Sequence, residues 1–222
     1  MIRNTNGIGM TSQRTRDRML SRLREQGIKD EVTLAALNEI PRHIFVDEAL
    51  STRAYEDVSL PIGFGQTISQ PYTVAKMTET LRAGKPLGKV LEIGTGCGYQ
   101  TAILSKVASE VYSLERISPL VMKARKHLRE LRMSNIKLKH ADGTIGLPEY
   151  GPFDGIIVTA AASHIPEGLL SQLALGGRMV IPVGTDEQIL YLIEHIDNNG
   201  TSEFKKTKLE PVKFVPLLGG TS

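Results

Sequence analysis

The sequence predicts an α/β protein whose mostly parallel, doubly wound sheet ends in an antiparallel β-hairpin and follows a helical N-terminal region. Between residues 89 and 183, short apolar runs of strand length alternate with segments of helical periodicity. That order builds a parallel sheet with helices on its faces. After Gly184 the alternation stops, and two β-rich runs flank Asn199-Gly200, which is a strong hairpin signal. Residues 11–86 contain helical patterns and no good strand.

The N-terminal region, residues 11–87, is expected to be helical. Asp30 is a favoured N-cap residue, and Gly27 and Gly84 stand where helices should end. Residues 1–10 are expected to be a loose lead-in, because Asn and Gly occupy them where a helix would need other residues. Three helices are predicted, over 12–26, 31–39 and 71–83.

Residues 88–183 are expected to hold the α/β core. Its predicted strands are 89–93, 110–115, 136–140, 153–161 and 177–183. Its predicted helices are 99–108, 118–131 and 166–173. Residues 184–222 then form the hairpin, with strands over 188–197 and 201–215. Because no internal repeat or low-complexity tract occurs, the 222 residues are expected to form a single domain.

Composition and charge exclude several classes of protein. A hydrophobic share of 41% is ordinary for a globular chain, and a net charge of +3 is too small to imply nucleic acid. No apolar run approaches the roughly 20 residues that a membrane span needs, and no secretory signal is evident. The single cysteine excludes an internal disulfide and suits a reducing compartment. We expect a cytoplasmic monomer without a membrane, nucleic-acid or metal partner, since the five histidines show no metal-ligand spacing.

The first core strand runs into LEIGTGCGYQ, residues 91–100. Gly94, Gly96 and Gly98 follow a strand and precede a helix, which is the context of a cofactor-binding loop. The spacing is G-x-G-x-G, and Tyr99 stands where a dinucleotide fingerprint has its third glycine. Glu115 ends the second strand, 21 residues after Gly94, where an acid reaches ribose hydroxyls.

Glu92 lies two residues before the first glycine. A carboxylate there would repel a pyrophosphate but could hold a cationic group. The pattern E-x-G-x-G-x-G with a later acid resembles the class I S-adenosylmethionine (SAM) methyltransferases. This resemblance implies a Rossmann-like sheet, glycines that face the methionine portion of SAM, and Glu115 on the ribose. It also places Asp142-Gly143, after the third strand, against the adenine.

Three plainer interpretations stay open. The glycines could only make a tight turn, a NAD-type fold could use a similar loop, and Asp142-Gly143 is a good turn dipeptide by itself.

Cys97 could be a thiol nucleophile. Without a paired base or a second cysteine, it is expected to fill a small-residue position instead.

The stretch GFGQTISQP, residues 63–71, has two interpretations. Serine is a favoured N-cap and proline is favoured in the first helical turn, so Ser69-Gln70-Pro71 predicts a helix start. The stretch also closes an aperiodic segment, residues 55–70. A long loop inside a compact domain is usually functional or disordered, and the apolar side chains of this one argue against disorder.

With the glycine loop placed, a family becomes recognisable. LPIGFGQTISQP, VLEIGTGCGYQTAIL, FDGIIVTAA and FVPL, together with PRHIFVDEA and SLERIS, resemble the bacterial protein-L-isoaspartate O-methyltransferases over about residues 12–218. The resemblance implies methyl transfer from SAM to the α-carboxylate of isoaspartyl residues in damaged proteins and peptides, which initiates their repair. Two departures are Cys97, where the family usually has serine, and Lys213, where it often has arginine. Lysine is a point charge and cannot replace a bidentate fork.

The resemblance also implies the site residues. Ser69 is expected to be catalytic as a hydrogen-bond donor that steers the substrate carboxylate. It would not be the nucleophile, since a methylated serine would be a stable ether. The implied cofactor-binding residues are Thr67, Ile68, Glu92, Gly94, Thr95, Gly96, Gly98, Glu115, Asp142 and Gly143. The implied substrate-binding residues are Ile62, Gln70, Val215 and Pro216.

Other functions remain possible at this point. VKFVPLL can also be a plain edge strand closed by a proline. The chain could be a class I methyltransferase with another carboxylate or small-molecule acceptor, or an idle SAM- or nucleotide-binding module. A NAD-linked dehydrogenase is a further alternative. Isoaspartyl proteins and peptides are the expected partners.

Overall fold

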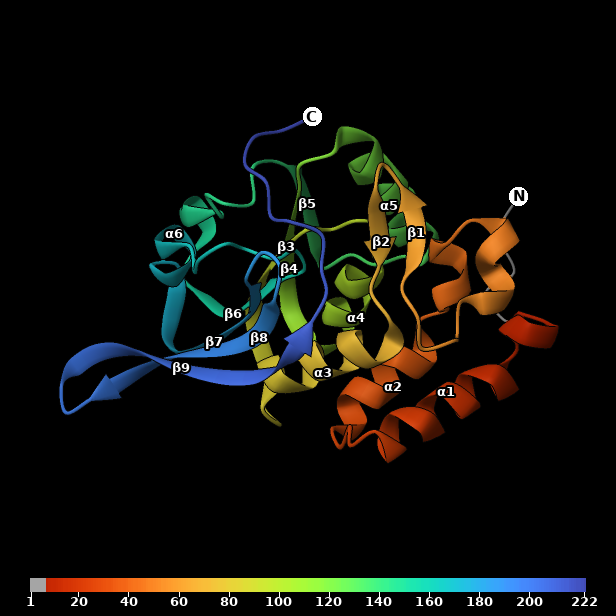
Figure 1. Ribbon diagram of the computed structural model, residues 1–222, viewed down its shortest axis with the longest axis horizontal. Coiled ribbons are helices and arrows are strands. Elements are labelled where there is room, and N and C mark those ends of the chain that lie inside the picture. Colours follow the sequence, from red (N-terminus) through yellow and green to blue (C-terminus); the bar gives the residue numbers. More distant parts are fainter. Residues whose placement is uncertain (1–6) are drawn as a thin grey trace.

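The computed structural model describes residues 7–222 and is built on a seven-stranded sheet with the order β5-β4-β3-β6-β7-β8-β9 (Figure 1). The parallel strands are β3 (Leu87–Ile93), β4 (Ala108–Glu115), β5 (Ile136–His140), β6 (Phe153–Val158) and β7 (Leu173–Val183). The strands β8 (Gln188–Asn198) and β9 (Thr201–Val212) continue the sheet antiparallel. The predicted fold class is confirmed, and β3 lies at the point where the strand order reverses.

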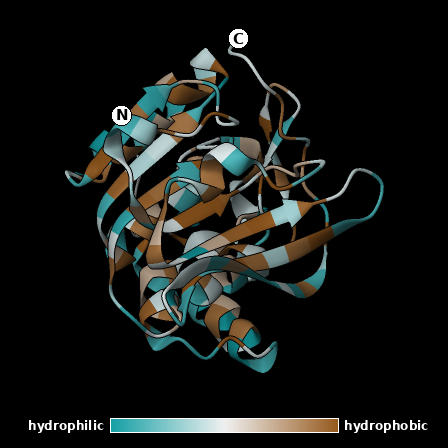
Figure 2. Cartoon of the chain, turned by 90° about the vertical axis from the view of Figure 1, so that its left-hand side faces the viewer, coloured by the Kyte–Doolittle hydropathy of each residue, from teal (hydrophilic) through white to brown (hydrophobic). Residues whose placement is uncertain are grey.

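Helices cover the two faces of the sheet unequally. The α-helices are α1 (Gln13–Glu25), α2 (Glu31–Glu39), α3 (Pro71–Arg82), α4 (Tyr99–Val107), α5 (Ser118–Glu130) and α6 (Glu167–Leu170). Short 3₁₀ helices are η1 (Gly9–Thr11), η2 (Arg42–Phe45), η3 (Glu48–Arg53) and η4 (Pro148–Tyr150). Alternate strand residues point to opposite faces, so Val90 packs with the side chains of α1–α5, whereas Leu91 packs on the thin layer around α6. Apolar residues accordingly run along the central strands in Figure 2.

The three predicted N-terminal helices are present as α1, α2 and α3. Asp30 caps α2 as expected, because its side chain accepts a hydrogen bond from the Thr33 N–H at 3.2 Å. Of the expected lead-in, residues 1–6 lie outside the described residues, and the turn η1 begins at Gly9.

The prediction that residues 11–86 contain no strand is wrong. Two short strands, β1 (Leu60–Gly63) and β2 (Gln66–Ile68), pair as an antiparallel hairpin outside the main sheet. The strands are only three or four residues long, so they carry too little alternation to show a period. Their turn uses positive φ at Gly63, Phe64 and Gly65, with 56° at Phe64, a conformation that bulky residues rarely adopt.

Two predicted core elements are shorter than expected. The strand predicted over 153–161 ends at Val158, and the helix predicted over 166–173 is limited to Glu167–Leu170. The helix is shorter because Leu173 already begins β7, opposite Phe153. Pairing with β6 therefore overrides the helical pattern at the end of this segment.

The chain leaves the sheet after Val212 and crosses the carboxyl ends of the central strands. The Ala161 N–H donates to the Val215 carbonyl at 2.8 Å, and the Leu217 N–H donates to the Ala161 carbonyl at 2.7 Å. The chain then reaches the end of β4, where Ser222 bonds to the backbones of Arg116 and Ser118. Figure 1 shows this segment and the β1–β2 hairpin over the same end of the sheet.

Candidate active site

A cavity, called here the long cavity, opens at the carboxyl ends of β3, β4 and β6. Its floor is formed by Gly94, Gly96, Glu115 and Gly143, and the C-terminal segment from Val215 forms part of its wall. This is the topological switch point, where open α/β sheets bind their ligands.

Packing explains the first glycine of the loop. Gly94 has a φ of 94°, and a Cβ atom there would lie 2.4 Å from Thr159 Oγ1. The Thr159 hydroxyl donates to the Gly94 carbonyl at 2.7 Å and lies 3.0 Å from the Ile93 carbonyl. A side chain at position 94 would therefore push the loop off the end of β6.

Glu115 is buried and lines the long cavity. Its Oε2 accepts the Gly96 N–H at 2.8 Å, and its Oε1 accepts the Ile117 N–H at 3.0 Å. Each oxygen has a further lone pair. The carboxylate is thus held in one orientation and can still accept hydrogen bonds from a pair of ligand hydroxyls.

The structure does not bring Glu92 to a cavity wall. Its side chain is fully buried, and its Oε2 accepts hydrogen bonds from the hydroxyls of Thr101 and Ser113. The Ser113 hydroxyl also lies 2.5 Å from Thr95 Oγ1 in the glycine loop. Burial raises the pKa of Glu92 to about 8. Glu92 therefore supports the loop through Ser113 and Thr95, with no contact of its own to the cavity.

Two further cavities adjoin the long one. The inner cavity lies between the end of β2 and the glycine loop, and its lining includes Thr67, Ile68, Ser69, Thr95 and Gln100. The outer groove runs from Ser69 to the C-terminal segment, and its lining includes Gln70, Thr73, Lys213 and Val215. Thr67 and Thr159 line all three. The three cavities therefore meet at these two side chains, next to Ser69.

The expected N-cap role of Ser69 is wrong. Gln70 is the N-cap of α3, because Pro71 occupies the first helical position. The Tyr72 N–H is satisfied by Asp57 Oδ1 at 2.9 Å, from 15 residues earlier in the chain. The Ser69 hydroxyl consequently has no hydrogen-bond partner within residues 7–222. It is left available to a ligand on the border of the inner cavity and the outer groove.

The remaining predicted residues divide into lining and supporting positions. Pro216 lines the long cavity. Ile62 is buried, and its side chain packs on Gly96, so it supports the loop from behind. Gly98 supports it similarly, since a Cβ there would lie 3.2 Å from Ala124 Cβ.

Asp142 lies beside the long cavity and binds the chain's own backbone. Its Oδ1 accepts the Thr144 N–H at 2.8 Å, and its Oδ2 accepts the Gly220 N–H at 2.5 Å. Although partial burial opposes the effect, these hydrogen bonds lower the pKa of Asp142. Asp142 thereby holds the C-terminal segment across the edge of the cavity, next to Gly143 in its lining.

Sequence reasoning missed Thr159 and the C-terminal residues beyond Pro216. Thr159 follows a buried parallel strand directly, which is a signal that could have been used, because ligand contacts gather at such ends. Nothing in the sequence indicates that Leu218 lines the cavity or that Ser222 returns to β4.

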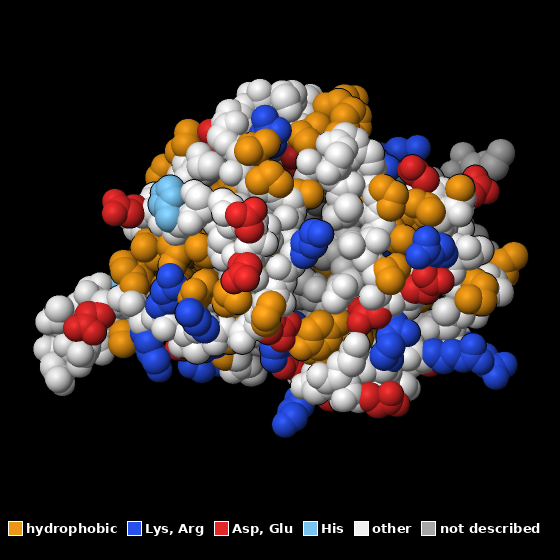
Figure 3. Space-filling model, in the orientation of Figure 1, with side chains coloured by type: hydrophobic (Ala, Val, Ile, Leu, Met, Phe, Trp, Pro, Cys, Tyr) orange, Lys and Arg blue, Asp and Glu red, His pale blue; other side chains and the backbone are white. Residues whose placement is uncertain are grey.

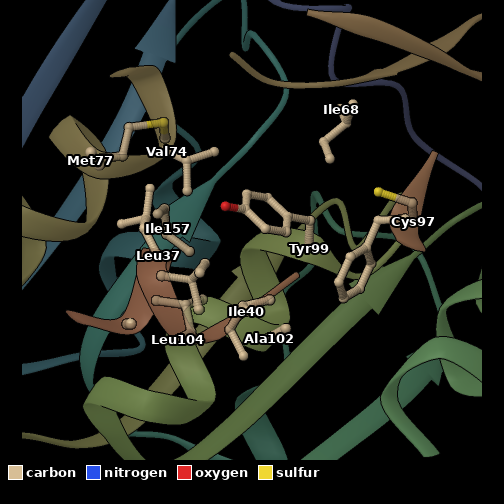
Figure 4. Close-up of a cluster of buried hydrophobic side chains, with 14 of the residues drawn as sticks. Leu37, Ile40, Ile68, Val74, Met77, Cys97, Tyr99, Ala102, Leu104 and Ile157 are labelled. Atoms are coloured by element: carbon tan, nitrogen blue, oxygen red, sulfur yellow. The ribbon is translucent and has the colours of Figure 1, made fainter. Parts of the chain in front are cut away.

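The surroundings of Cys97 agree with the prediction that it fills a small-residue position. Its side chain lies in the buried cluster with Tyr99 and Ile68 (Figure 4). Burial raises the pKa of the thiol to about 11, so it stays protonated at neutral pH and is a poor nucleophile.

Comparison with known proteins decides the family. The family model of protein-L-isoaspartate(D-aspartate) O-methyltransferase (PCMT) matches residues 14–222. The chain belongs to this family. A protein-L-isoaspartate O-methyltransferase from Methylobacillus flagellatus is 79% identical over 97% of both chains. Another, from Nitrosomonas europaea, is 63% identical over 97% of this chain and 96% of its own.

Solved structures of PCMT proteins have the same fold. One protein-L-isoaspartate O-methyltransferase superimposes with a TM-score of 0.80 at 28% identity, over 92% of this chain and 66% of that longer one. A Plasmodium falciparum protein described as a PCMT, in complex with S-adenosyl-L-homocysteine, gives a TM-score of 0.74 at 29% identity, over 90% and 97%. The predicted family, the SAM cofactor and the isoaspartyl methyltransferase activity are thereby confirmed. The roles of individual residues remain predictions.

Proposed function

We propose that SAM binds in the long cavity and that the isoaspartyl carboxylate binds in the outer groove, with methyl transfer where the two meet. The observation that carries this assignment is the Ser69 hydroxyl, which has no partner among the described residues and lies on the border of the inner cavity and the outer groove. A serine hydroxyl can donate one hydrogen bond and accept others, so it can bind a ligand carboxylate at this border.

The long cavity fits the chemistry of the cofactor. Glu115 keeps acceptor capacity for the two ribose hydroxyls. Gly94 and Gly96 let a ligand approach the backbone, and Gly143 does so on the adenosine side. Thr67, Ile68 and Thr95 line the inner cavity, where the methionine portion would lie. Glu92 and Gly98 hold this loop from behind.

The outer groove offers several donors to one carboxylate. Besides Ser69, the backbone N–H groups of Thr73 and Val215 have no acceptor among residues 7–222. Thr73 lies in the first turn of α3, where the helix dipole favours an anion. Lys213 is the only cationic side chain in this part of the lining. An ionised carboxylate is the ligand that matches such a set of groups.

The reaction needs alignment and exclusion of water more than acid–base chemistry. An α-carboxylate titrates at about 3.5, so it is ionised at neutral pH and no base has to remove a proton. SAM supplies an electrophilic methyl group on a sulfonium. A carboxylate oxygen takes the methyl as the carbon–sulfur bond breaks, and opposite charges cancel. A dry pocket that orients the oxygen therefore favours the transition state over separated charges.

Ser69→Ala tests this assignment. Loss of a charge-assisted hydrogen bond, worth about 1.5–3 kcal/mol, lowers turnover on an isoaspartyl peptide by about one to two decades. Folding and affinity for S-adenosylhomocysteine stay as in the wild type. The measurement is methyl release from an isoaspartyl peptide and from its aspartyl twin, with Ser59→Ala as a control in the same groove. Unchanged turnover, or an equal loss of cofactor affinity, would remove Ser69 from this role.

The cellular location and the assembly state are inferred from composition and charge. Within residues 7–222, no helix is long and apolar enough to cross a membrane. On the face in Figure 3, acidic and basic side chains are interspersed apart from a local group of lysines on β9. A cytoplasmic monomer that acts on isoaspartyl proteins and peptides, without nucleic acid or metal, stays the prediction from the lone cysteine and the modest charge.

A further inference from the structure

The ladder between β8 and β9 stops at the pair Gln188–Val212, yet its hydrogen bonding continues by one more rung. The Phe214 N–H donates to Gln188 Oε1 at 2.6 Å, and Gln188 Nε2 donates to the Phe214 carbonyl at 3.0 Å. The side-chain amide thus takes the place of a peptide group and binds both polar groups of Phe214.

The other edge of the same segment is held by backbone alone. Ala161 bonds to the Val215 carbonyl and to the Leu217 N–H, and Pro216 between them has no N–H to donate. Residues 214–217 are therefore clamped between one glutamine side chain and one residue after β6. Lys213 and Val215, which line the outer groove, flank the clamped Phe214.

Gln188 itself does not line the outer groove. It lines a neighbouring hollow with Thr185 and Asp186, and this hollow shares Lys213 and Phe214 with the groove. Any effect of Gln188 on the acceptor must be transmitted by the backbone of residues 213–215.

We propose that Gln188 is a positioning residue for the acceptor site, which fixes the Val215 N–H and the Lys213 ammonium by clamping Phe214. The inference rests on the proposed placement of the isoaspartyl carboxylate in the outer groove. Glutamine is suited to this task, because its amide accepts and donates at once over the required reach. An ionised glutamate offers no donor to the Phe214 carbonyl, and asparagine is one methylene shorter.

The test compares Gln188→Ala and Gln188→Glu with the wild type, using an isoaspartyl peptide at saturating SAM. A displacement of about 1 Å can cost up to about 100-fold in rate, so kcat/KM is expected to fall at least about tenfold in both variants at pH 7.5. Affinity for S-adenosylhomocysteine, measured by calorimetry, falls much less than kcat/KM, because the clamp touches only the wall formed by the C-terminal segment, whereas the glycine loop and Glu115 lie on other elements. Thr185→Ala, in the same hollow, is the matched control and keeps the wild-type kcat/KM.

The pH dependence of Gln188→Glu separates positioning from a general loss of stability. A protonated glutamic acid can donate to the Phe214 carbonyl and accept from the Phe214 N–H, as glutamine does. The ratio of its kcat/KM to that of the wild type therefore rises as the pH falls from 7.5 to 5, whereas the ratio for Gln188→Ala stays flat.

Three results would overturn the proposal: Gln188→Ala within twofold of the wild type, a loss of cofactor affinity equal to the loss of kcat/KM, or the same pH profile for both variants. Ser69→Ala, assayed in parallel, distinguishes failure of the clamp proposal from failure of the proposed acceptor site. If Ser69→Ala is impaired and Gln188→Ala is not, only the clamp is refuted. If both variants match the wild type, the proposed position of the acceptor site is wrong, and the clamp proposal is refuted as well.

Discussion

The long cavity, proposed to bind the cofactor, and the outer groove, proposed to bind the acceptor, are built in opposite ways. Behind the glycines that line the long cavity the chain is closely packed: a Cβ on Gly94 would meet Thr159, and one on Gly143 would lie 2.4 Å from Ile93 Cγ2. Along the outer groove, in contrast, polar groups such as the Ser69 hydroxyl and the Val215 N–H have no partner in the described chain.

The difference shows how each side obtains its specificity. Dense packing behind the glycines shapes the proposed cofactor site, so a side chain introduced at one of them should lower stability and cofactor affinity together. Unpaired donors shape the acceptor site, so a substitution there should change turnover and leave stability nearly untouched.

Gly94→Ala is expected to have the largest effect. The new methyl group would lie 2.4 Å from Thr159 Oγ1 and would force a residue with a side chain to a φ of 94°. Strain and overpacking together cost about 3 kcal/mol in free energy of unfolding. Displacement of the loop also lowers affinity for S-adenosylhomocysteine by about 100-fold or more. Denaturant unfolding and calorimetry measure the two quantities.

The double variant Gly94→Ala/Thr159→Ala is the control for packing. Removal of the Thr159 hydroxyl relieves the clash but leaves the backbone strain, so part of the lost stability returns. If Gly94→Ala binds S-adenosylhomocysteine as tightly as the wild type, close packing at Gly94 does not determine cofactor affinity, and the contrast between the two regions is refuted.

Glu92→Gln tests how the buried carboxyl supports the loop. The pKa of Glu92 is raised by burial from its ordinary value of 4.5 to about 8. The folded state therefore holds an extra proton between these values, and its stability falls as the pH rises through this window. Glutamine carries no such proton. Between pH 6 and pH 8, the variant is expected to gain about 2 kcal/mol relative to the wild type.

The same variant decides whether Glu92 touches the cofactor. Glutamine keeps an oxygen for Thr101 and Ser113, so affinity for S-adenosylhomocysteine at pH 7 should change by no more than about threefold. A loss of tenfold or more, without unfolding, would instead indicate a direct charge contact with the ligand.

Asp57→Ala is expected to have the smallest effect. Asp57 accepts the Tyr72 N–H at the start of α3 and also the Gln26 side chain at 2.9 Å. Loss of such a cap costs about 1 kcal/mol, visible in thermal unfolding, while cofactor affinity stays constant. Asp57→Asn keeps the acceptor oxygen and should retain most of the stability. An unchanged melting temperature in Asp57→Ala would show that another group caps α3.

Local patterns in the sequence were sufficient for much of this protein. The order of strands and helices between residues 89 and 183, the Asp30 cap and the position of Glu115 at the cavity follow from periodicity, capping chemistry and the end of a strand. These features depend on residues a few positions apart, and their physical causes act over the same short range.

Only the tertiary structure decided which polar groups remain available to a ligand and which bind other groups of the protein. Ser69 is available because Asp57, 15 residues before Tyr72, accepts the Tyr72 N–H that a local cap would have bound. Glu92 is turned away from the cavity by Thr101 and by Ser113 on the next strand, and Phe214 is held by Gln188 from 26 residues earlier. Each outcome depends on competition between partners that only folding brings together.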